Sequence, residues 1–289
     1  MTFSIVAWDP DAHPRPEWGV AVASKFLAVG AVVPWARAGA GAVATQALAN
    51  IRYGPEGLAH LAGGLTAAAV VALVTEADDE RDDRQLGIVD ARGDAATFTG
   101  SRCFDWAGGR TGSGYCCQGN ILTGPGVVDA MAEAFEATRG ELARRLLAAL
   151  RAGDAAGGDS RGRQSAALLV VRAGGGYGAG TDKMVDLRVD DHAEPIPELE
   201  RIFELHSWLF PRSESLRFVT IDDTIERELR AGLMRAGHEP GSGTGYDAGL
   251  RSALLAYVGS ENLEERWTDD ARIEQGVLDS LRNAGNSRS

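Results

Sequence analysis

Residues 2–24 read TFSIVAWDPDAHPRPEWGVAVAS, and this stretch carries the strongest structural signal in the chain. Residues 2–8 alternate and are rich in β-forming side chains, and residues 18–24 have the same character. Between them, the Asp and Pro residues of segment 9–16 begin a turn and keep the loop out of regular structure. The stretch therefore predicts two strands of a hairpin with an unusually long loop.

Thr2 directly follows Met1, and this position gives it a second interpretation. Because Thr is small, an aminopeptidase can remove Met1 and leave a threonine with a free α-amine. That amine can accept the hydroxyl proton as Oγ1 attacks a carbonyl carbon, so nucleophile and base lie on one residue. An α-amine has a pKa of about 7.7–8.0, so a useful fraction is neutral at cell pH. The simpler alternative is that a small residue after Met only starts a strand.

Outward from the hairpin, the sequence predicts an α+β chain. Further strands are expected at 31–38, 85–90, 95–100, 115–122, 164–172 and 184–190. Helices are expected at 54–62, 66–77, 126–138 and 141–152, the second with Thr66 as its N-cap. This order fits two sheets sandwiched between two helical layers, and it also fits other α+β arrangements.

A domain boundary is expected after His192, where the next residues read AEPIP. We expect a first domain over residues 1–194, a linker helix over 195–212 and a small all-α domain over 213–289. Helical patterns in this last part cover 221–236, 248–258 and 273–281.

Composition and charge exclude several classes of function. The chain has 289 residues and a net charge of −12, which argues against electrostatic binding of nucleic acids or anionic membranes. No signal-peptide pattern occurs at the N-terminus, and no apolar run approaches the roughly 18 residues of a membrane span. The three cysteines lack a Cys-x-x-Cys spacing and fit reduced thiols. We therefore expect a cytoplasmic protein with no nucleic-acid or membrane partner.

Several motifs resemble, in chain order, a bacterial family of unknown function, DUF1028. They are MTFSIVAWDP, WGVAVASKFLAVGAVVPWARAG, GAVATQALANIRYGPEGL, QLGIVDARGDAATFTG, DWAGGRTG, QGNIL, GDSRGRQSAALLVV and DLRVDDH. The resemblance implies the N-terminal nucleophile (Ntn) hydrolase superfamily, whose fold is a four-layer αββα sandwich and whose members cleave amide bonds with an N-terminal Thr, Ser or Cys. In the tail, HEPGSGTGYDAGLRSALLAYVGSENLEERW resembles a peptidoglycan-binding-like helical domain.

The resemblance also implies roles for residues beside Thr2. A start like that of proteasome-type hydrolases places Ser24 and Lys25, at the end of the second strand, near the N-terminus. The Lys25 cation would lower the pKa of the amine and keep it neutral, and Ser24 would orient the amine or a water. The alternatives are a solvated strand end for Lys25 and a polar turn residue for Ser24.

Four more residues are candidates for substrate binding. Segment 41–46 resembles the small-residue strand that forms the pocket wall and an oxyanion-hole amide, and it contains Thr45 and Gln46. Asn50 follows Gln46 by one helical turn, so both would face the same way and either bind substrate or cap a helix. Trp35 stands beside a proline and is either a ligand platform or part of the core.

A second cluster lies around the Gly-rich loop 157–162, which leads into a buried strand. Asp159 or Ser165 could lie beside the free amine, with Arg161 near the substrate. The alternative is an Asp–Arg pair that only rigidifies the loop. Asn120, at a strand end, could donate a hydrogen bond to an oxyanion.

Other familiar sites are absent from the sequence. The five histidines are scattered without metal-ligand spacing, so no metal site is expected. The Gly-rich loop lacks the Lys of a phosphate-binding loop, and Cys116 and Cys117 have no obvious His base. We expect an amidohydrolase with Thr2 as nucleophile and no cofactor, acting on a small-molecule substrate with a polar amide or ureido-type C–N bond. The alternatives are a non-catalytic metabolite-binding protein and an assembly protein. A homo-oligomer is expected under all three hypotheses.

Overall fold

The structure is a computed structural model that describes residues 2–284. The chain divides into two compact units between Ile202 and Phe203. This division falls inside helix α5 (Pro195–Leu209), which occupies most of the segment where the sequence predicts a linker helix. Each unit has its own hydrophobic core and is described separately.

The first unit contains ten strands, four complete helices and the first part of a fifth helix, α5. The strands are β1 (Thr2–Asp9), β2 (Glu17–Ser24), β3 (Pro34–Arg37), β4 (Gly41–Ala47), β5 (Arg84–Asp90), β6 (Ala95–Thr99), β7 (Gly108–Gly112), β8 (Tyr115–Asn120), β9 (Ser165–Arg172) and β10 (Lys183–Val189). The helices are α1 (Tyr53–Ala62), α2 (Ala67–Glu76), α3 (Gly126–Ala137), α4 (Leu142–Ala155) and α5.

All of these strands pair antiparallel, in two sheets. The six-stranded sheet has the order β10-β9-β2-β1-β8-β7, and the four-stranded sheet has the order β3-β4-β5-β6. The predicted hairpin is confirmed: β1 and β2 are central neighbours, with Phe3 opposite Ala23. Strand β7, whose sequence is GGRTG, has weak β-propensity and was not predicted; it forms because β8 supplies a partner.

The two sheets face each other across an apolar core. Val6, Val20 and Val22 of the six-stranded sheet pack with Ala42, Ala44 and Val89 of the four-stranded sheet. Burial of such side chains contributes about 25 cal/mol per Å² of apolar surface. Because side chains alternate along a strand, the even-numbered residues of β1 and β2 face the other sheet.

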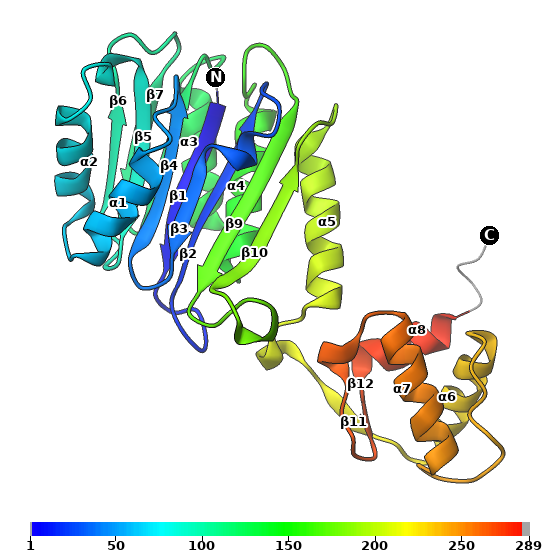
Figure 1. Ribbon diagram of the computed structural model, residues 1–289. Coiled ribbons are helices and arrows are strands. Elements are labelled where there is room, and N and C mark those ends of the chain that lie inside the picture. Colours follow the sequence, from blue (N-terminus) through cyan, green and yellow to red (C-terminus); the bar gives the residue numbers. More distant parts are fainter. Residues whose placement is uncertain (1, 285–289) are drawn as a thin grey trace. The chain divides into compact units, whose positions relative to one another are not determined.

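Helices cover the outer faces of both sheets (Figure 1). Helices α1 and α2 pack on the four-stranded sheet, and α3 and α4 pack on the six-stranded sheet. Thr66 caps α2 as predicted, because its side chain accepts a hydrogen bond from the Ala69 amide. The expected combination of helices and sheets is confirmed, and the sheets are antiparallel.

The second unit is mainly helical. The prediction that it is all-α is wrong, because it also contains a pair of short strands. Its helices are α6 (Asp223–Arg235), α7 (Ala248–Ser260) and α8 (Gln275–Asn283). Strands β11 (Phe218–Thr220) and β12 (Arg272–Glu274) form an additional antiparallel pair. Three residues are too few for an alternating pattern, so the sequence could not indicate these strands. Across residues 2–284, no helix has the length and apolar character needed to cross a membrane.

Candidate active site

The hairpin brings Thr2 and Ser24 together on the face that looks toward the second sheet. Thr2 is 5% exposed, and its Oγ1 lies 3.1 Å from Ser24 Oγ. The two residues occupy the position beyond Phe3 and Ala23 in the β1–β2 register. Met1, whose removal the nucleophile hypothesis requires, lies outside the described residues.

Neighbouring strands extend this pair into a row of polar residues. Asn120 at the end of β8 lies opposite Thr2, and Ser165 at the start of β9 lies opposite Ser24. Residues directly opposite in an antiparallel pair share one face of the sheet. Four candidates that the sequence singled out from separate motifs therefore line one edge, in the order Ser165, Ser24, Thr2, Asn120. We call them the Thr2 row.

Ser165 uses its hydroxyl to hold the segment that follows Ser24. Its Oγ donates to the Phe26 carbonyl at 2.5 Å and accepts from the Val29 amide at 3.1 Å. The sequence hypothesis placed Asp159 or Ser165 beside the free amine, and in the structure the two hydrogen bonds of Ser165 support the loop that follows β2. Its backbone position still completes the Thr2 row.

The Asp159 carboxylate contacts the backbone amide of Lys25 and not its ammonium group. The Asp159 carboxylate accepts from the Lys25 amide at 2.8 Å, and Arg161 donates to the same carboxylate from Nε and Nη2. The Lys25 side chain is exposed, and its Nζ donates to the carbonyl of Arg163 at 3.2 Å. The Asp159–Arg161 pair that the sequence offered as a rigid loop is present and anchors the end of β2.

The facing sheet contributes two glutamines beneath the row. Gln46 and Gln85 lie opposite each other on β4 and β5, and Gln46 Nε2 donates to Gln85 Oε1 at 2.8 Å. Asn120 Nδ2 also donates to Gln85 Oε1, at 2.9 Å. Gln46 Nε2 lies 3.4 Å from the Thr2 carbonyl. Since these amides are nearly fully buried, every bond they make matters for stability.

Two further members of this network are Ser4 and Gln118, which lie opposite each other on β1 and β8. Ser4 Oγ donates to Gln46 Oε1 at 2.7 Å and accepts from Gln118 Nε2 at 2.7 Å. Sequence reasoning missed Ser4 and Gln85. The available signal was a polar residue at an inward-facing position of each predicted strand.

The prediction that Gln46 and Asn50 face the same way is wrong, because the segment is a strand followed by a loop and not a helix. Gln46 lies in β4 and faces the six-stranded sheet, whereas Asn50 lies beyond the strand and donates to Asp78 at 2.9 Å. Thr45 faces away from Gln46 because strand residues alternate, and its hydroxyl donates to the Asn50 carbonyl at 3.0 Å.

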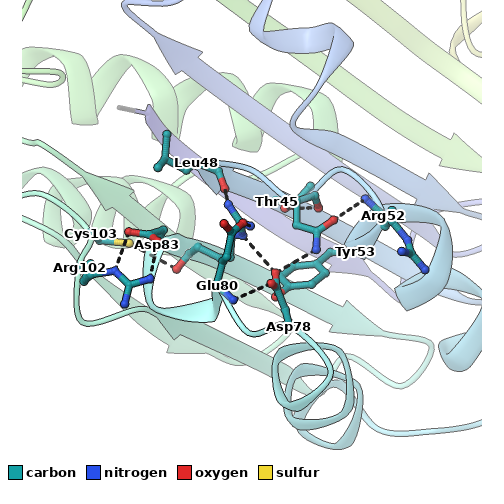
Figure 2. Close-up of polar contacts among 11 residues, drawn as sticks. Thr45, Leu48, Arg52, Tyr53, Asp78, Glu80, Asp83, Arg102 and Cys103 are labelled. Atoms are coloured by element: carbon teal, nitrogen blue, oxygen red, sulfur yellow. Dashed lines mark hydrogen bonds and ion pairs between the residues drawn. The ribbon is translucent and has the colours of Figure 1, made fainter.

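Asn50 belongs to a second polar cluster, which is centred on Asp78 (Figure 2). The Asp78 carboxylate accepts from Asn50, from the Tyr53 hydroxyl at 2.8 Å and from Arg84 Nε at 3.1 Å. Burial alone would raise the pKa of Asp78, but the hydrogen bonds from Asn50, Arg84 and Tyr53 lower it well below its usual range. Burial and the bond to Asp78 raise the pKa of Tyr53. The cluster ties the loop after β4 to β5.

Trp35 is a packing residue rather than an open platform. A Cβ at Gly54 of α1 would lie 2.3 Å from the indole ring, so the helix backbone rests directly against Trp35. The indole Nε1 donates to the Val32 carbonyl at 2.9 Å. The ring is therefore part of the layer between α1 and the four-stranded sheet.

A pocket of about 280 Å³ opens beside Ser24, and Thr2 is not among the residues that line it. Its lining includes Ser24 and Asp159 together with Phe3, Asp154 and Arg163. Arg163 Nε donates to Asp154 Oδ1 at 2.7 Å, so the pocket wall contains a salt bridge. Its volume suits a small molecule, and Ser24 is shared between the pocket and the Thr2 row.

The cysteines do not offer a rival nucleophile. Cys116 and Cys117 are fully buried in β8, and burial raises the pKa of Cys116 to about 12 and that of Cys117 well above its usual range. Burial also raises the pKa of Cys103, whose Sγ donates to the Arg84 carbonyl. Among residues 2–284, no group of three or more His, Cys, Asp or Glu side chains is arranged to hold a metal ion.

Comparison with known proteins finds two families in this chain. Residues 2–199 match "Family of unknown function (DUF1028)", and residues 209–281 match "Putative peptidoglycan binding domain". No curated protein matches. A crystal structure of a DUF1028 protein from Silicibacter pomeroyi is similar, with 38% identity and a TM-score of 0.65. That similarity covers 71% of this chain and 89% of the other. The chain therefore belongs to the DUF1028 family, with a peptidoglycan-binding-like domain matched at its C-terminal side.

Proposed function

We propose that this protein is an Ntn-type amidohydrolase that cleaves a C–N bond in a small polar amide or ureido compound. Thr2 is the nucleophile once Met1 has been removed. One observation carries the proposal: Thr2 Oγ1 contacts Ser24 Oγ at 3.1 Å, and Ser24 lines a pocket of small-molecule size. The two antiparallel sheets between helical layers support it further, because the superfamily implied by the sequence resemblance has that layering.

The chemistry requires only groups of the Thr2 row. Thr2 Oγ1 attacks the carbonyl carbon and its proton passes to the Thr2 α-amine, which then delivers that proton to the departing nitrogen. The C–N bond breaks and an ester to Thr2 remains. Water, deprotonated by the same amine, attacks the ester and regenerates the hydroxyl. No metal or organic cofactor enters these steps.

The other candidates take supporting roles in this proposal. Ser24 orients the Thr2 hydroxyl, and Asn120, opposite Thr2, donates to the oxyanion. Asp159 and Ser165 hold the backbone that follows Ser24, which shapes the pocket edge. Arg161, which is paired with Asp159, contributes to substrate binding in this proposal. Lys25 contributes a positive charge at the exposed rim.

Intact-mass spectrometry of the purified protein is the first test, and we expect a mass lower by one methionine. The second test uses a strained lactone, which an N-terminal threonine opens to an ester, with the proton passing to the released alkoxide. We expect one adduct on the peptide that begins at Thr2. Thr2→Ser should retain labelling and Thr2→Ala should abolish it.

Two results would contradict the proposal. One is full retention of Met1 in protein that turns over an amide substrate, and the other is unchanged turnover by Thr2→Ala. Retained Met1 without turnover would favour the alternative, a non-catalytic protein whose pocket binds a metabolite or whose surfaces serve assembly.

A further inference from the structure

The amide of Gln85 has only one orientation that satisfies its surroundings. Its Nε2 donates to the carbonyl oxygens of Gly119 at 2.7 Å and Gly108 at 3.2 Å, and to Thr99 Oγ1 at 3.0 Å. Backbone carbonyls cannot donate, so the amide nitrogen must face them. Gln85 is fully buried, and water cannot compensate for a reversed amide.

The oxygen of Gln85 is therefore directed at the Thr2 row. Oε1 accepts from Asn120 Nδ2 at 2.9 Å and from Gln46 Nε2 at 2.8 Å, which uses both of its lone pairs. Asn120 must consequently direct its amide nitrogen, and not its oxygen, toward Gln85. A reversed Asn120 would place two amide oxygens against each other in a buried site.

The orientation of Gln85 also fixes the donor and acceptor directions of Gln46 and of the residues that it contacts. With its nitrogen committed to Gln85, Gln46 presents Oε1 to Ser4, whose hydroxyl must donate. Ser4 then accepts from Gln118 Nε2. Gln118 Oε1 is left at the end of this series as a buried acceptor without a hydrogen bond among the described residues. One arrangement of protons satisfies the whole network up to that atom.

We propose that Gln85 is a positioning residue for the Thr2 site, which holds the Asn120 carboxamide in a single, nitrogen-inward orientation. The consequence for catalysis rests on the proposed function, in which Asn120 donates to the oxyanion. The orientation itself does not depend on that function. Gln85 reaches Asn120 from the opposite sheet, so the two sheets must be packed together before the donor is in place.

The test replaces Gln85 with glutamate, which keeps the shape of the side chain and replaces the donating amide group with a carboxyl oxygen. When protonated, the introduced carboxyl can still donate to the Gly119 carbonyl; when ionised, it faces two carbonyl oxygens without any proton. The neutral form is favoured only in the folded state, so its pKa rises on folding above the roughly 4.3 of an unfolded Glu. Stability relative to wild type is therefore lost as the pH rises above that value.

We expect the melting temperature of Gln85→Glu to approach that of the wild type near pH 4.5 and to fall progressively below it toward pH 8. Thr99→Val is the matched control, because it removes one acceptor but leaves both carbonyls and Asn120 in contact with Gln85. Its difference from wild type should not vary with pH. A pH-independent difference for Gln85→Glu would overturn the assigned orientation.

Lactone labelling at Thr2 tests the catalytic consequence separately. Gln85→Glu should label at least tenfold more slowly than wild type at pH 8, and Thr99→Val at the wild-type rate, with Met1 removed in each. Gln85→Met, which cannot accept from Asn120, should show the same loss if the Glu variant does not fold. Equal labelling of all variants would overturn the positioning role. Absence of labelling in the wild type would instead count against the proposed function, and the melting comparison would still decide the orientation.

Discussion

Thr2 Oγ1 and Ser24 Oγ lie 3.1 Å apart, although the two residues are 22 positions apart in the chain. The antiparallel register of β1 and β2 places them side by side at the open end of the hairpin. A buried hydroxyl beside another hydroxyl loses rotational freedom, so the hydroxyl of Thr2, the proposed nucleophile, is held in one orientation without a ligand.

Ser24→Ala should slow acylation of Thr2 by about fivefold, because one neutral hydrogen bond contributes roughly 1 kcal/mol. The measurement is the rate of adduct formation by mass spectrometry, with Met1 removal checked in the same spectrum. Ser160→Ala is a suitable control, since Ser160 is exposed in the Gly-rich loop. A wild-type rate in Ser24→Ala would argue that Ser24 does not orient the nucleophile.

Asp78→Asn should destabilise the first unit by about 1.5–3 kcal/mol at pH 7, the range for hydrogen bonds to a charged group. The pKa of Asp78 is lowered in the folded state by Asn50, Arg84 and Tyr53, so its stabilisation is present above the unfolded pKa of about 3.9. The difference from wild type should therefore shrink as the pH falls below about 4. Urea unfolding at several pH values measures it, and the exposed neighbour Asp79→Asn should show little effect.

Gly87→Ala should cost about 1–3 kcal/mol, the usual range for overpacking a core. A Cβ at Gly87 would lie 2.1 Å from Gln118 Oε1, whose amide is held by Ser4. Gly57→Ala in α1 is the matched control, because its Cβ would meet Val43 at an ordinary 3.4 Å. We expect it to be neutral or stabilising by up to about 1 kcal/mol. Equal unfolding free energies for the two variants would contradict the close packing at Gly87.

Alkylation should distinguish the cysteines. Cys116 and Cys117 are fully buried with raised pKa values, so iodoacetamide at pH 7.5 should leave them unmodified in folded protein. Cys103, which is partly exposed, should react slowly. In urea all three should react. Rapid modification of Cys116 or Cys117 in folded protein would show that β8 opens far more readily than its burial indicates.

The hairpin of residues 2–24 was predictable because its signal is local: alternation and turn residues act on neighbours along the chain. The same holds for the N-cap of α2 and for the helices of both units. Strand β7 was not predictable, because its pairing with β8 overrides weak propensity. Gln46 and Asn50 were misjudged because a helical period was applied to a segment that pairs as a strand with β5.

The sequence by itself identified the candidate residues: Thr2 behind Met1, Ser24 and Asn120 at strand ends, and Asp159 and Arg161 in a Gly-rich loop. Only the tertiary structure decided which of them meet. Sheet register aligned Ser165, Ser24, Thr2 and Asn120 into one row, and packing of the second sheet brought Gln46 and Gln85 beneath it. Register and sheet packing join residues far apart in the chain, and no local pattern encodes those distances.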